Sequence, residues 1–450
     1  MHETRTLAQF VVETSFPDLP AGLVEECKIA MLDALAAGFI GTVQPWSQRA
    51  LTMLRLLGGV PEATIIHQPW QTDIARAALG NGILIGAFEC EPLTGSHASG
   101  TVLPAALAVS QREGLPGRIF LTALALGFEL SARIAHTAVG LETVRGFHNP
   151  GTQGPFGAAA AVGKLLSFDV DTLVNALGLA GSCSAGLLEF ASTGADTKRL
   201  HLGRASQLGL ESALLAQHGL RGPGTVLEGR YGYFTAFSEP TDLAPLVDGL
   251  GQNWAIRPPS HKSFATHVTH QAVVQAILEW KQQHAVAAQS ISRVIIHGTP
   301  RITEARHAQP DPPTVMGGQY SLPFTAAVAC LRDLSNPLVY TEDAVHDPAV
   351  RALARRIELV ADENLARTAA DRFQARIVIE CADHTYTLHT RPHQGSPRHP
   401  FTWTDISAKF RRYTAHCLSD TRATAIIEAV RALEQATNMR DVAEMLAQSH

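Results

Sequence analysis

The stretch that decides the fold class runs from residue 154 to residue 191 and reads GPFGAAAAVGKLLSFDVDTLVNALGLAGSCSAGLLEFA. It holds two long apolar windows, 154–168 and 171–191, and Asp169 or Asp171 supplies a start signal for the second helix. Because both windows are apolar on nearly every helical face, we expect helices that are buried on all sides. The stretch therefore predicts a large, many-layered helical domain.

Helical windows of the same kind fill most of the chain from Ala21 to about Leu220, at residues 23–41, 73–88, 102–114, 119–139 and 204–219. They are separated by glycine and proline breaks, and Gly219 and Gly222 give the last of them its stop signal.

The character of the sequence changes after Pro258. ISRVIIHG (291–298) and ARIVIECADHTYTLHT (375–390) carry β-branched runs that predict strands, with helical windows between them. The last part of the chain reads as helix again. We therefore predict a mainly α protein, in which a helical domain built from both chain ends (1–258 and 403–450) receives a smaller α+β domain (259–402) as an inserted lid.

Composition excludes several classes of partner. Of the 450 residues 46% are hydrophobic and only 17% are charged, against a usual charged share of ~25%. The 36 Lys and Arg residues against 41 Asp and Glu residues give a net charge of −5, so neither nucleic acid nor a membrane surface is an expected partner. With so few charges, we expect another copy of the chain to cover part of the surface, as in a homodimer.

The six cysteines lie far apart without a Cys-x-x-Cys pair, which argues against a zinc site or a disulfide scaffold and for a reducing compartment. The first residues do not resemble a signal peptide, and no run reaches the ~18 apolar residues of a membrane span. We expect a cytoplasmic protein. Cys183 lies in an apolar window and is expected to be a buried small hydrophobe rather than a nucleophile.

A loop between two apolar helices, FECEPLTGSHASG (88–100), is crowded with polar side chains: Glu89, Glu91, Thr94, His97 and Ser99. Loops held by a rigid scaffold often carry functional sites. Histidine is the side chain best suited to exchange protons near neutral pH, which singles out His97. The alternative is a solvated turn with capping hydroxyls.

A second group begins with Arg145 and His148, which precede a glycine-rich helix entry. Backbone N–H groups from Gly154 to Gly157 can hold a carboxylate, or the glycines serve close helix packing; both alternatives stay open. No phosphate-binding glycine motif is present, so we expect no nucleotide cofactor.

Two clusters of basic side chains follow. The first contains Lys198, Arg199, His201 and Arg204. The second contains His261, Lys262, His267 and His270. Either cluster can be a solvated surface cap. Together, with few acids beside them, they favour an acidic substrate. The spacing of His267 and His270 suits two imidazoles on one helix face, but the sequence shows no third ligand, so we expect no metal site and no cofactor.

Long blocks of this chain, in this order, resemble the MmgE/PrpD family, which includes 2-methylcitrate dehydratase, cis-aconitate decarboxylase and iminodisuccinate epimerase. The blocks are NGILIGAFE (81–89), SHASGTVLPAALA (96–108), GFHNPGTQGPFGAAAAVGKLL (146–166), AGSCSAGLLEFASTGADTKRLHLGRASQLGL (180–210), KSFATHVTHQA (262–272), YSLPFTAAVA (320–329) and AKF (408–410). The resemblance implies a helical domain from both termini, an inserted lid, a homodimer and cofactor-independent chemistry on di- or tricarboxylates in a cleft between the domains.

The resemblance carries four residues over directly. His97 matches the histidine of the family's His-Pro-Ser loop, and Lys198 matches the lysine of its Thr-Lys block. Lys262 and His267 match the lysine and histidine at the lid junction.

Four positions depart from the family pattern. Glu89 stands at the first aspartate of an Asp-x-Asp-Asp-Thr stretch, and Thr94 is a loose counterpart of its threonine, because this loop is about two residues shorter than the family's. Ala98 replaces the usual proline. Phe324 stands where cis-aconitate decarboxylases carry a tyrosine, so a hydroxyl that can move a proton is missing, which disfavours decarboxylation.

These residues suggest a mechanism in which a proton is moved next to a carboxylate. We expect His97, Lys198 and His267 to be catalytic: His97 as acid/base oriented by Glu89, Lys198 as its partner or as a carboxylate clamp. The predicted substrate-binding residues are Glu89, Thr94, Arg145, His148, Lys262 and Phe324. Alanine at position 97 or 198 should then abolish turnover and leave the fold intact.

The predicted function is that of a lyase. We expect a hydro-lyase similar to 2-methylcitrate dehydratase first, and an enzyme similar to cis-aconitate decarboxylase second. One alternative is an epimerase or isomerase of an iminodisuccinate-like dicarboxylate. A further alternative is a catalytically impaired paralogue that only binds polycarboxylates.

Overall fold

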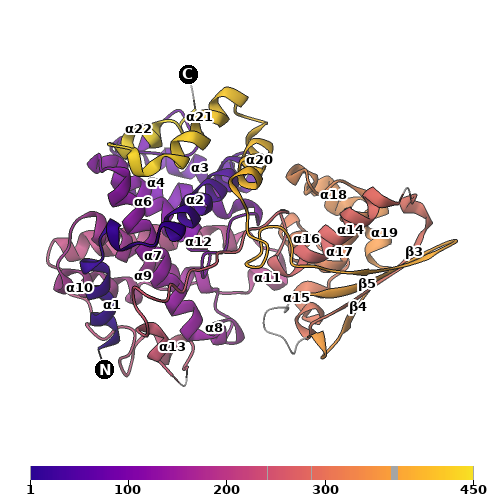
Figure 1. The fold of residues 1–450 in the computed structure, drawn as a ribbon, viewed down its shortest axis with the longest axis horizontal. Coiled ribbons are helices and arrows are strands. Elements are labelled where there is room, and N and C mark those ends of the chain that lie inside the picture. The colour runs from indigo at the N-terminus through magenta and orange to yellow at the C-terminus, as the bar shows by residue number, and fades with distance from the viewer. Residues whose placement is uncertain (1, 241, 285, 366–372, 449–450) are drawn as a thin grey trace. The chain divides into compact units, whose positions relative to one another are not determined.

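The computed structural model describes residues 2–240, 242–284, 286–365 and 373–448, which form two compact units (Figure 1). Unit 1 comprises Met1–Leu188, Thr197–Ser260 and Thr402–His450, and unit 2 comprises Glu189–Asp196 and His261–Phe401. The domain limits predicted from the sequence, 1–258, 259–402 and 403–450, stay predictions. One difference is that they include residues 189–196 in the helical domain, whereas these residues belong to unit 2 of the structure.

Unit 1 is helical apart from a short hairpin of β1 (Ala63–Thr64) and β2 (Gln71–Thr72). Its α-helices are α1 (Glu3–Glu13), α2 (Ala21–Gly41), α3 (Pro45–Leu57), α4 (Ile74–Ile85), α5 (Ala98–Thr101), α6 (Leu103–Glu113), α7 (Gly117–Ala138), α8 (Leu141–Val144), α9 (Asn149–Leu165), α10 (Val170–Ser182), α12 (Thr197–Gln217), α13 (Tyr233–Phe237), α20 (Trp403–Thr414), α21 (Asp420–Arg431) and α22 (Met439–Glu444).

The core of unit 1 lies among α2, α4, α7, α9 and α12, which pack on one another. As the sequence predicts, these helices are buried on nearly every side. Helix α7 is long and apolar enough to cross a membrane, but 83% of its most apolar window is buried inside the structure. This burial is typical of a core helix of a folded domain.

Segments from the N-terminal and C-terminal parts of the chain pack together in unit 1, where α20 lies against α2 (Figure 1). A buried ion pair joins the two helices, with Lys409 Nζ 2.5 Å from Asp33 Oδ1. The same ammonium donates a hydrogen bond to the carbonyl of Cys90, at 3.0 Å. Lys409 thus ties both chain ends to the loop that carries Glu89 and Glu91.

Helices α4 and α12 approach each other backbone to backbone. A Cβ atom at Gly82 would lie 2.6 Å from Gly203 Cα, and a Cβ atom at Gly203 would lie 2.3 Å from the carbonyl oxygen of Leu79. Only glycine permits this separation. The contact places the first turn of α12, which carries Lys198, beside the loop that follows α4.

Unit 2 is an α+β unit, as the sequence predicts. Its four-stranded mixed sheet has the order β4-β3-β5-β6, with β3 parallel to β4 and antiparallel to β5. The strands are β3 (Ile291–Gly298), β4 (Ile357–Ala361), β5 (Ala375–Cys381) and β6 (Thr385–His389), and the helices are α11 (Phe190–Thr193), α14 (Gln271–Gln283), α15 (Ala305–Ala308), α16 (Val315–Tyr320), α17 (Leu322–Leu331), α18 (Glu342–His346) and α19 (Pro348–Ala354).

The predicted helix over 171–191 is wrong beyond Ser182, where α10 ends. The backbone N–H of His148 donates to the carbonyl of Gly186, and that of Leu188 donates to Gly146. This pairing with a distant segment draws the chain out of the helix. Cys183 consequently lies exposed at the helix end, so the prediction of a buried hydrophobe is also wrong.

We expect Gly203→Ala to destabilise the protein by about 1–3 kcal/mol, because the added methyl overlaps a backbone carbonyl of α4. The matched control is Gly224→Ala, at an exposed position where the nearest atom to the added Cβ is Val174 Cγ1 at 3.6 Å. Urea unfolding of both variants measures the difference. An equal effect of the two substitutions would show that the close approach of α4 and α12 is not needed.

Candidate functional site

The candidate site of unit 1 is built on the loop that follows α4. Glu89 and His97 both adopt left-handed backbone conformations, with φ of 56° and 55°. Such values are uncommon outside glycine and cost of order 1–3 kcal/mol, and they concentrate at functional positions. Two of them in one loop, on an acid and a histidine, mark this segment as a functional candidate.

Several hydrogen bonds hold the loop in place. Leu93 and Ser260 form a backbone bridge, and Ser99 Oγ donates to the carbonyl of Pro92 at 2.9 Å. Thr94, predicted to bind substrate, is buried, and its hydroxyl accepts the backbone N–H of Ser99 at 3.0 Å. This bond supports the start of α5 beside His97.

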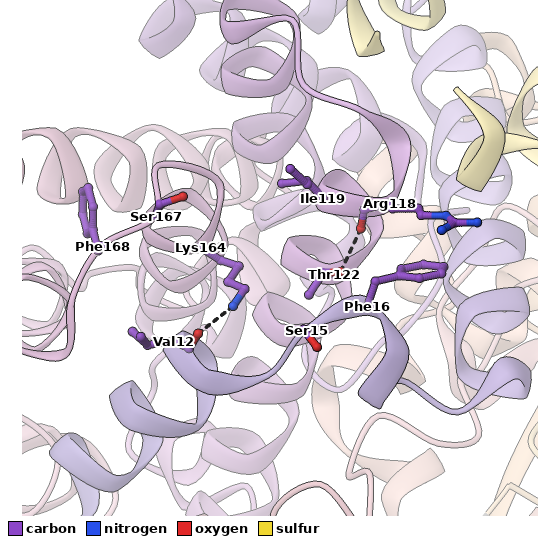
Figure 2. Close-up of a pocket in the computed structure, with 9 residues that line it drawn as sticks. All are labelled: Val12, Ser15, Phe16, Arg118, Ile119, Thr122, Lys164, Ser167 and Phe168. Atoms are coloured by element: carbon purple, nitrogen blue, oxygen red, sulfur yellow. Dashed lines mark hydrogen bonds between the residues drawn. The ribbon is translucent and has the colours of Figure 1, made fainter. Parts of the chain in front are cut away.

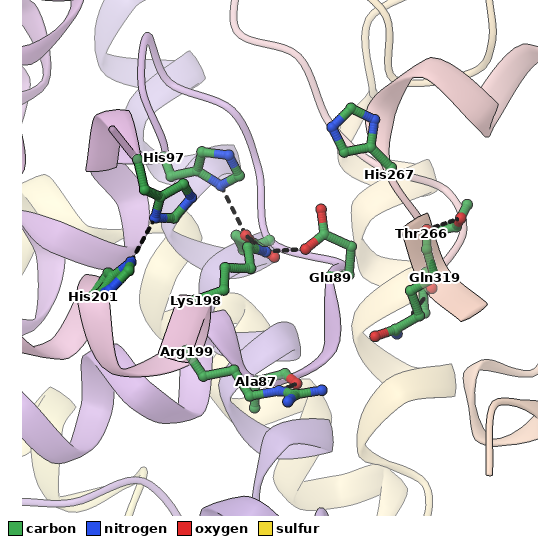
Figure 3. A network of polar contacts seen from close by, with 12 residues as sticks. Ala87, Glu89, His97, Lys198, Arg199, His201, Thr266, His267 and Gln319 are labelled. Atoms are coloured by element: carbon green, nitrogen blue, oxygen red, sulfur yellow. Dashed lines mark hydrogen bonds and ion pairs between the residues drawn. The ribbon is translucent and has the colours of Figure 1, made fainter. Parts of the chain in front are cut away.

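Lys198, in the first turn of α12, lies between two carboxylates of the loop (Figure 3). Its Nζ forms an ion pair with Glu89 Oε2 and a second with Glu91 Oε1, the latter at 2.9 Å. The three side chains are at most 1% exposed. Burial works against the charge on Lys198, but the two carboxylates outweigh it and raise the pKa of Lys198 above its ordinary value.

Glu91 connects this ion pair to His97. The same Oε1 atom that meets Lys198 lies 2.8 Å from His97 Nδ1. An ionised carboxylate only accepts hydrogen bonds, so Nδ1 carries a proton and Nε2 is the ring nitrogen that faces away from Glu91. The sequence analysis assigned the orienting role to Glu89. The described contact of His97 Nδ1 is with Glu91, and that of Glu89 is with Lys198.

His97 is the member of this group that solvent reaches, with 19% of its side chain exposed against 0% for Glu91. Its ring lies 6.3 Å from that of His148, and the His148 ring lies 5.1 Å from that of His201. The Nδ1 atoms of His148 and His201 are 3.0 Å apart, so one donates to the other. Burial, helped by His201, His97 and Lys198, lowers the pKa of His148 well below its ordinary value.

The glycines from Gly154 to Gly157 do not lie at a helix N-terminus, as the anion-binding alternative requires. Helix α9 begins at Asn149, so Gly154 to Gly157 lie in its interior, where main-chain N–H groups face carbonyls of the preceding turn. A Cβ atom at Gly157 would lie 2.1 Å from Ser131 Oγ, which supports the close-packing alternative. Arg145 is partly exposed and forms its described contacts with Glu239, at 2.9 Å, and with the carbonyl of Ala236.

Unit 2 carries the other predicted residues. Lys262 is fully buried, and His267 is partly exposed at the start of the 3-10 turn Val268–His270. Burial, with His307 and His270 and the charges of Arg301 and Lys262, lowers the pKa of His267 well below its usual range.

The aromatic ring beside His267 is that of Tyr320, with centroids 4.9 Å apart. Phe324 is fully buried against Gly318 and 6.5 Å from the Tyr340 ring. Of these two aromatic rings, that of Tyr320 is therefore the one beside His267, and the sequence reasoning did not single it out.

The chain matches two family models: the MmgE/PrpD N-terminal domain over residues 5–246 and the MmgE/PrpD C-terminal domain over residues 264–435. The chain belongs to the MmgE/PrpD family. It is similar to cis-aconitate decarboxylase of Mus musculus (26% identical, covering 96% of this chain and 90% of that protein) and of Homo sapiens (27%, 92% and 88%). The protein of the same name from Aspergillus terreus (strain NIH 2624 / FGSC A1156) is 25% identical, with 98% and 95% covered.

A separate pocket of unit 1, of about 390 Å³, contains none of the predicted site residues of this family member (Figure 2). It lies where the end of α1 meets α7 and the end of α9. Lys164 reaches into it and donates to the carbonyl of Val12 at 2.7 Å. The residues described in its wall include no carboxylate and no imidazole, so it lacks the groups of the candidate site.

A buried carboxylate, Glu142 of α8, braces the segment that carries His148. It accepts hydrogen bonds from Tyr233 Oη, from Gln153 Nε2 at 2.6 Å and from Thr152 Oγ1 at 3.3 Å. Burial nevertheless raises the pKa of Glu142 to about 7, against the lowering effect of Gln153 and Thr152. The carboxyl thus keeps its proton in the folded state at a pH where the unfolded chain releases it.

Because this pKa is raised on folding, its stabilising effect is complete below about pH 4.5 and is lost as the pH rises through about 7. We expect Glu142→Gln, which stays neutral, to gain stability relative to the unmodified protein between pH 5 and pH 8, by at most about 3 kcal/mol. Urea unfolding at both pH values measures this. Parallel pH dependences of the two proteins would contradict the raised pKa.

Removing the charge of Lys198 should affect folding as well as turnover, because two buried carboxylates lose the cation that they share. This separates Lys198 from His97, whereas the sequence analysis expected both substitutions to spare the fold. We expect Lys198→Met to lower the free energy of unfolding by about 3–5 kcal/mol. In the control, Glu89→Gln combined with Lys198→Met recovers part of the loss, measured by urea unfolding. No recovery would mean that Glu89 does not carry the buried charge.

Proposed function

We propose that this chain is a lyase that acts on a di- or tricarboxylate by moving a proton at a carbon next to a carboxylate, with His97 as the acid/base. The observation that carries the proposal is the chain of contacts from Lys198 through Glu91 to His97. A general base needs a fixed orientation and access to the substrate. The Glu91 contact supplies the first for His97, and its partial exposure supplies the second.

In the dehydration that we expect first, His97 Nε2 takes the proton from the carbon next to a carboxylate. The electrons of the broken C–H bond form the C=C bond, and the C–O bond to the β-hydroxyl breaks. The leaving oxygen takes up a proton and departs as water. Glu91 stabilises the imidazolium that forms in between, because its carboxylate lies 2.8 Å from Nδ1.

Lys198 acts through Glu91 in this proposal, as a positioning residue. Of the two roles that the sequence left open, partner of His97 or clamp on the substrate, its two carboxylate contacts favour the first. The carboxylates of the substrate then require other donors. Thr94 in unit 1, and Lys262, His267 and Phe324 in unit 2, stay the candidates that the resemblance implies. Arg145 and His148 stay candidates from the sequence reasoning alone, and Glu239 competes with a substrate for Arg145.

Dehydration and decarboxylation begin with related proton transfers. The absence of a hydroxyl at Phe324 favours dehydration. The relatives named cis-aconitate decarboxylase make cis-aconitate the first decarboxylation substrate to test. Both outcomes are lyase reactions and share His97.

The test is to incubate the chelator-treated full chain in D₂O with 2-methylcitrate, citrate, cis-aconitate and iminodisuccinate and to follow the proton NMR spectrum. We expect a new alkene from a hydroxy-acid. His97→Asn should reduce the rate by about 10²–10⁴-fold. Asparagine tolerates the left-handed backbone at position 97 and keeps a donor for Glu91, so it removes only the basic nitrogen.

The matched control is His218→Asn, at an exposed position after α12, which should leave the rate unchanged. Loss of CO₂ from cis-aconitate would identify a decarboxylase instead. Deuterium uptake without elimination would identify an epimerase. Full activity of His97→Asn on any of these substrates would remove His97 from the mechanism.

A further inference from the structure

Three histidines of unit 2 converge from two segments that lie far apart in the sequence. His267 and His270 flank a 3-10 turn, and His307 belongs to α15. Their ring centroids are 4.6 Å (His267 to His307), 5.7 Å (His267 to His270) and 5.5 Å (His270 to His307) apart. One ring nitrogen from each lies within 4.8 Å of the others. The third ligand that the sequence lacked is therefore His307.

Two of these rings present buried nitrogens that no described residue contacts through a hydrogen bond. They are Nε2 of His270 and Nε2 of His307, both in side chains that are 0% exposed. A buried polar atom without a partner costs about 1–3 kcal/mol. Such atoms are rare in folded proteins, and a bound ion is one of the reasons for them.

Hydrogen bonds at the opposite ring atoms decide the tautomers. His307 Nδ1 lies 3.1 Å from the carbonyl oxygen of Tyr320, which can only accept, so the proton is on Nδ1. His270 Nδ1 lies 3.0 Å from Thr266 Oγ1, and that hydroxyl donates to the carbonyl of Gln319 at 2.8 Å. Thr266 Oγ1 must then accept from His270. Both Nε2 atoms consequently hold lone pairs, the arrangement typical of histidines that ligate metals.

His267 completes the set. Its Nδ1 lies 2.9 Å from Thr269 Oγ1, a hydroxyl that can accept the ring proton and leave the lone pair on Nε2. In that tautomer Nδ1 carries the proton, so it can no longer accept the backbone N–H of Thr269, which lies 3.4 Å away. His267 is the member of the cluster that is partly exposed, so solvent reaches the cluster at this residue.

We propose that His267, His270 and His307 bind one divalent transition-metal ion through their ring nitrogens, with Zn²⁺ as the best match. Three imidazoles with one open position form a common zinc arrangement. Tetrahedral zinc with bonds of about 2.0–2.1 Å holds its nitrogens about 3.3–3.4 Å apart, so the present spacing contracts by at most about 1.5 Å on binding.

The charges around the cluster set a limit on its affinity. Lys262 and Arg301 act electrostatically on His267, and Arg306 and Glu304 act with Arg301 on His307. Three cations against one carboxylate oppose a dication. We therefore expect weaker binding than at a histidine site with acidic neighbours, and an anion or hydroxide as the fourth ligand.

The test uses the chelator-treated full chain without substrate, so its result does not depend on the proposed reaction. Titration with Zn²⁺ in a calorimeter should give one ion per chain, and Co²⁺ should show the visible absorption bands of a tetrahedral complex. His307→Gln and His267→Gln should each lower the Zn²⁺ affinity by at least about 100-fold, and Thr266→Val by about 10–100-fold, because Thr266 sets the tautomer of His270.

Two controls separate this cluster from other histidines. His218→Gln, at an exposed position, and His201→Gln, which breaks the histidine pair of unit 1, should both leave the affinity unchanged. His267 is partly exposed, so His267→Gln tests the site even if a substitution at the buried His307 prevents folding. Failure to bind Zn²⁺, binding that survives His267→Gln, or binding lost in His201→Gln would overturn the proposal.

Discussion

The buried ion pair of Lys198 with Glu89 and Glu91 is the interaction on which the rest of the unit 1 site depends. Neither partner can reach the other unless α12 lies against α4, and that approach requires glycine at positions 82 and 203. Arg199, the next residue of α12, donates to the carbonyl of Ala87 at 2.8 Å and so joins the same helix to the residue that precedes the loop. The site is thus a product of helix packing more than of the loop's own conformation.

The described contacts of this cluster limit what it can do. Two carboxylates, Glu89 and Glu91, take up the ammonium of Lys198, so the contacts of that ammonium are with the protein. A carboxylate beside His97 also works against binding an anion at the same place. We therefore expect groups outside these contacts to attract a carboxylate substrate, and the arrangement around His97 suits moving a proton more than binding an anion.

The sequence predicted what local patterns determine. Helices that are apolar on all faces became the core of unit 1, and the β-branched runs became β3, β5 and β6. The resemblance to the family placed His97 and Lys198 in the site, where the structure brings them together through Glu91.

The sequence could not assign the orienting role between Glu89 and Glu91, because both lie in a loop without periodicity. Helix α10 ended early because its C-terminal side pairs with a segment almost forty residues before it, and His307 was missed because it comes 37 residues after His270.

The two histidine groups of this protein show how the partner of an imidazole decides its chemistry. In unit 1 the Nδ1 atom of His97 faces the carboxylate of Glu91. In unit 2 the Nδ1 atoms of His270 and His307 face a hydroxyl and a carbonyl, which fix a neutral tautomer without adding charge. A carboxylate partner suits a ring that must accept a proton and release it again. Neutral partners suit rings whose lone pairs converge on one point, because such rings can coordinate an ion without first losing a proton.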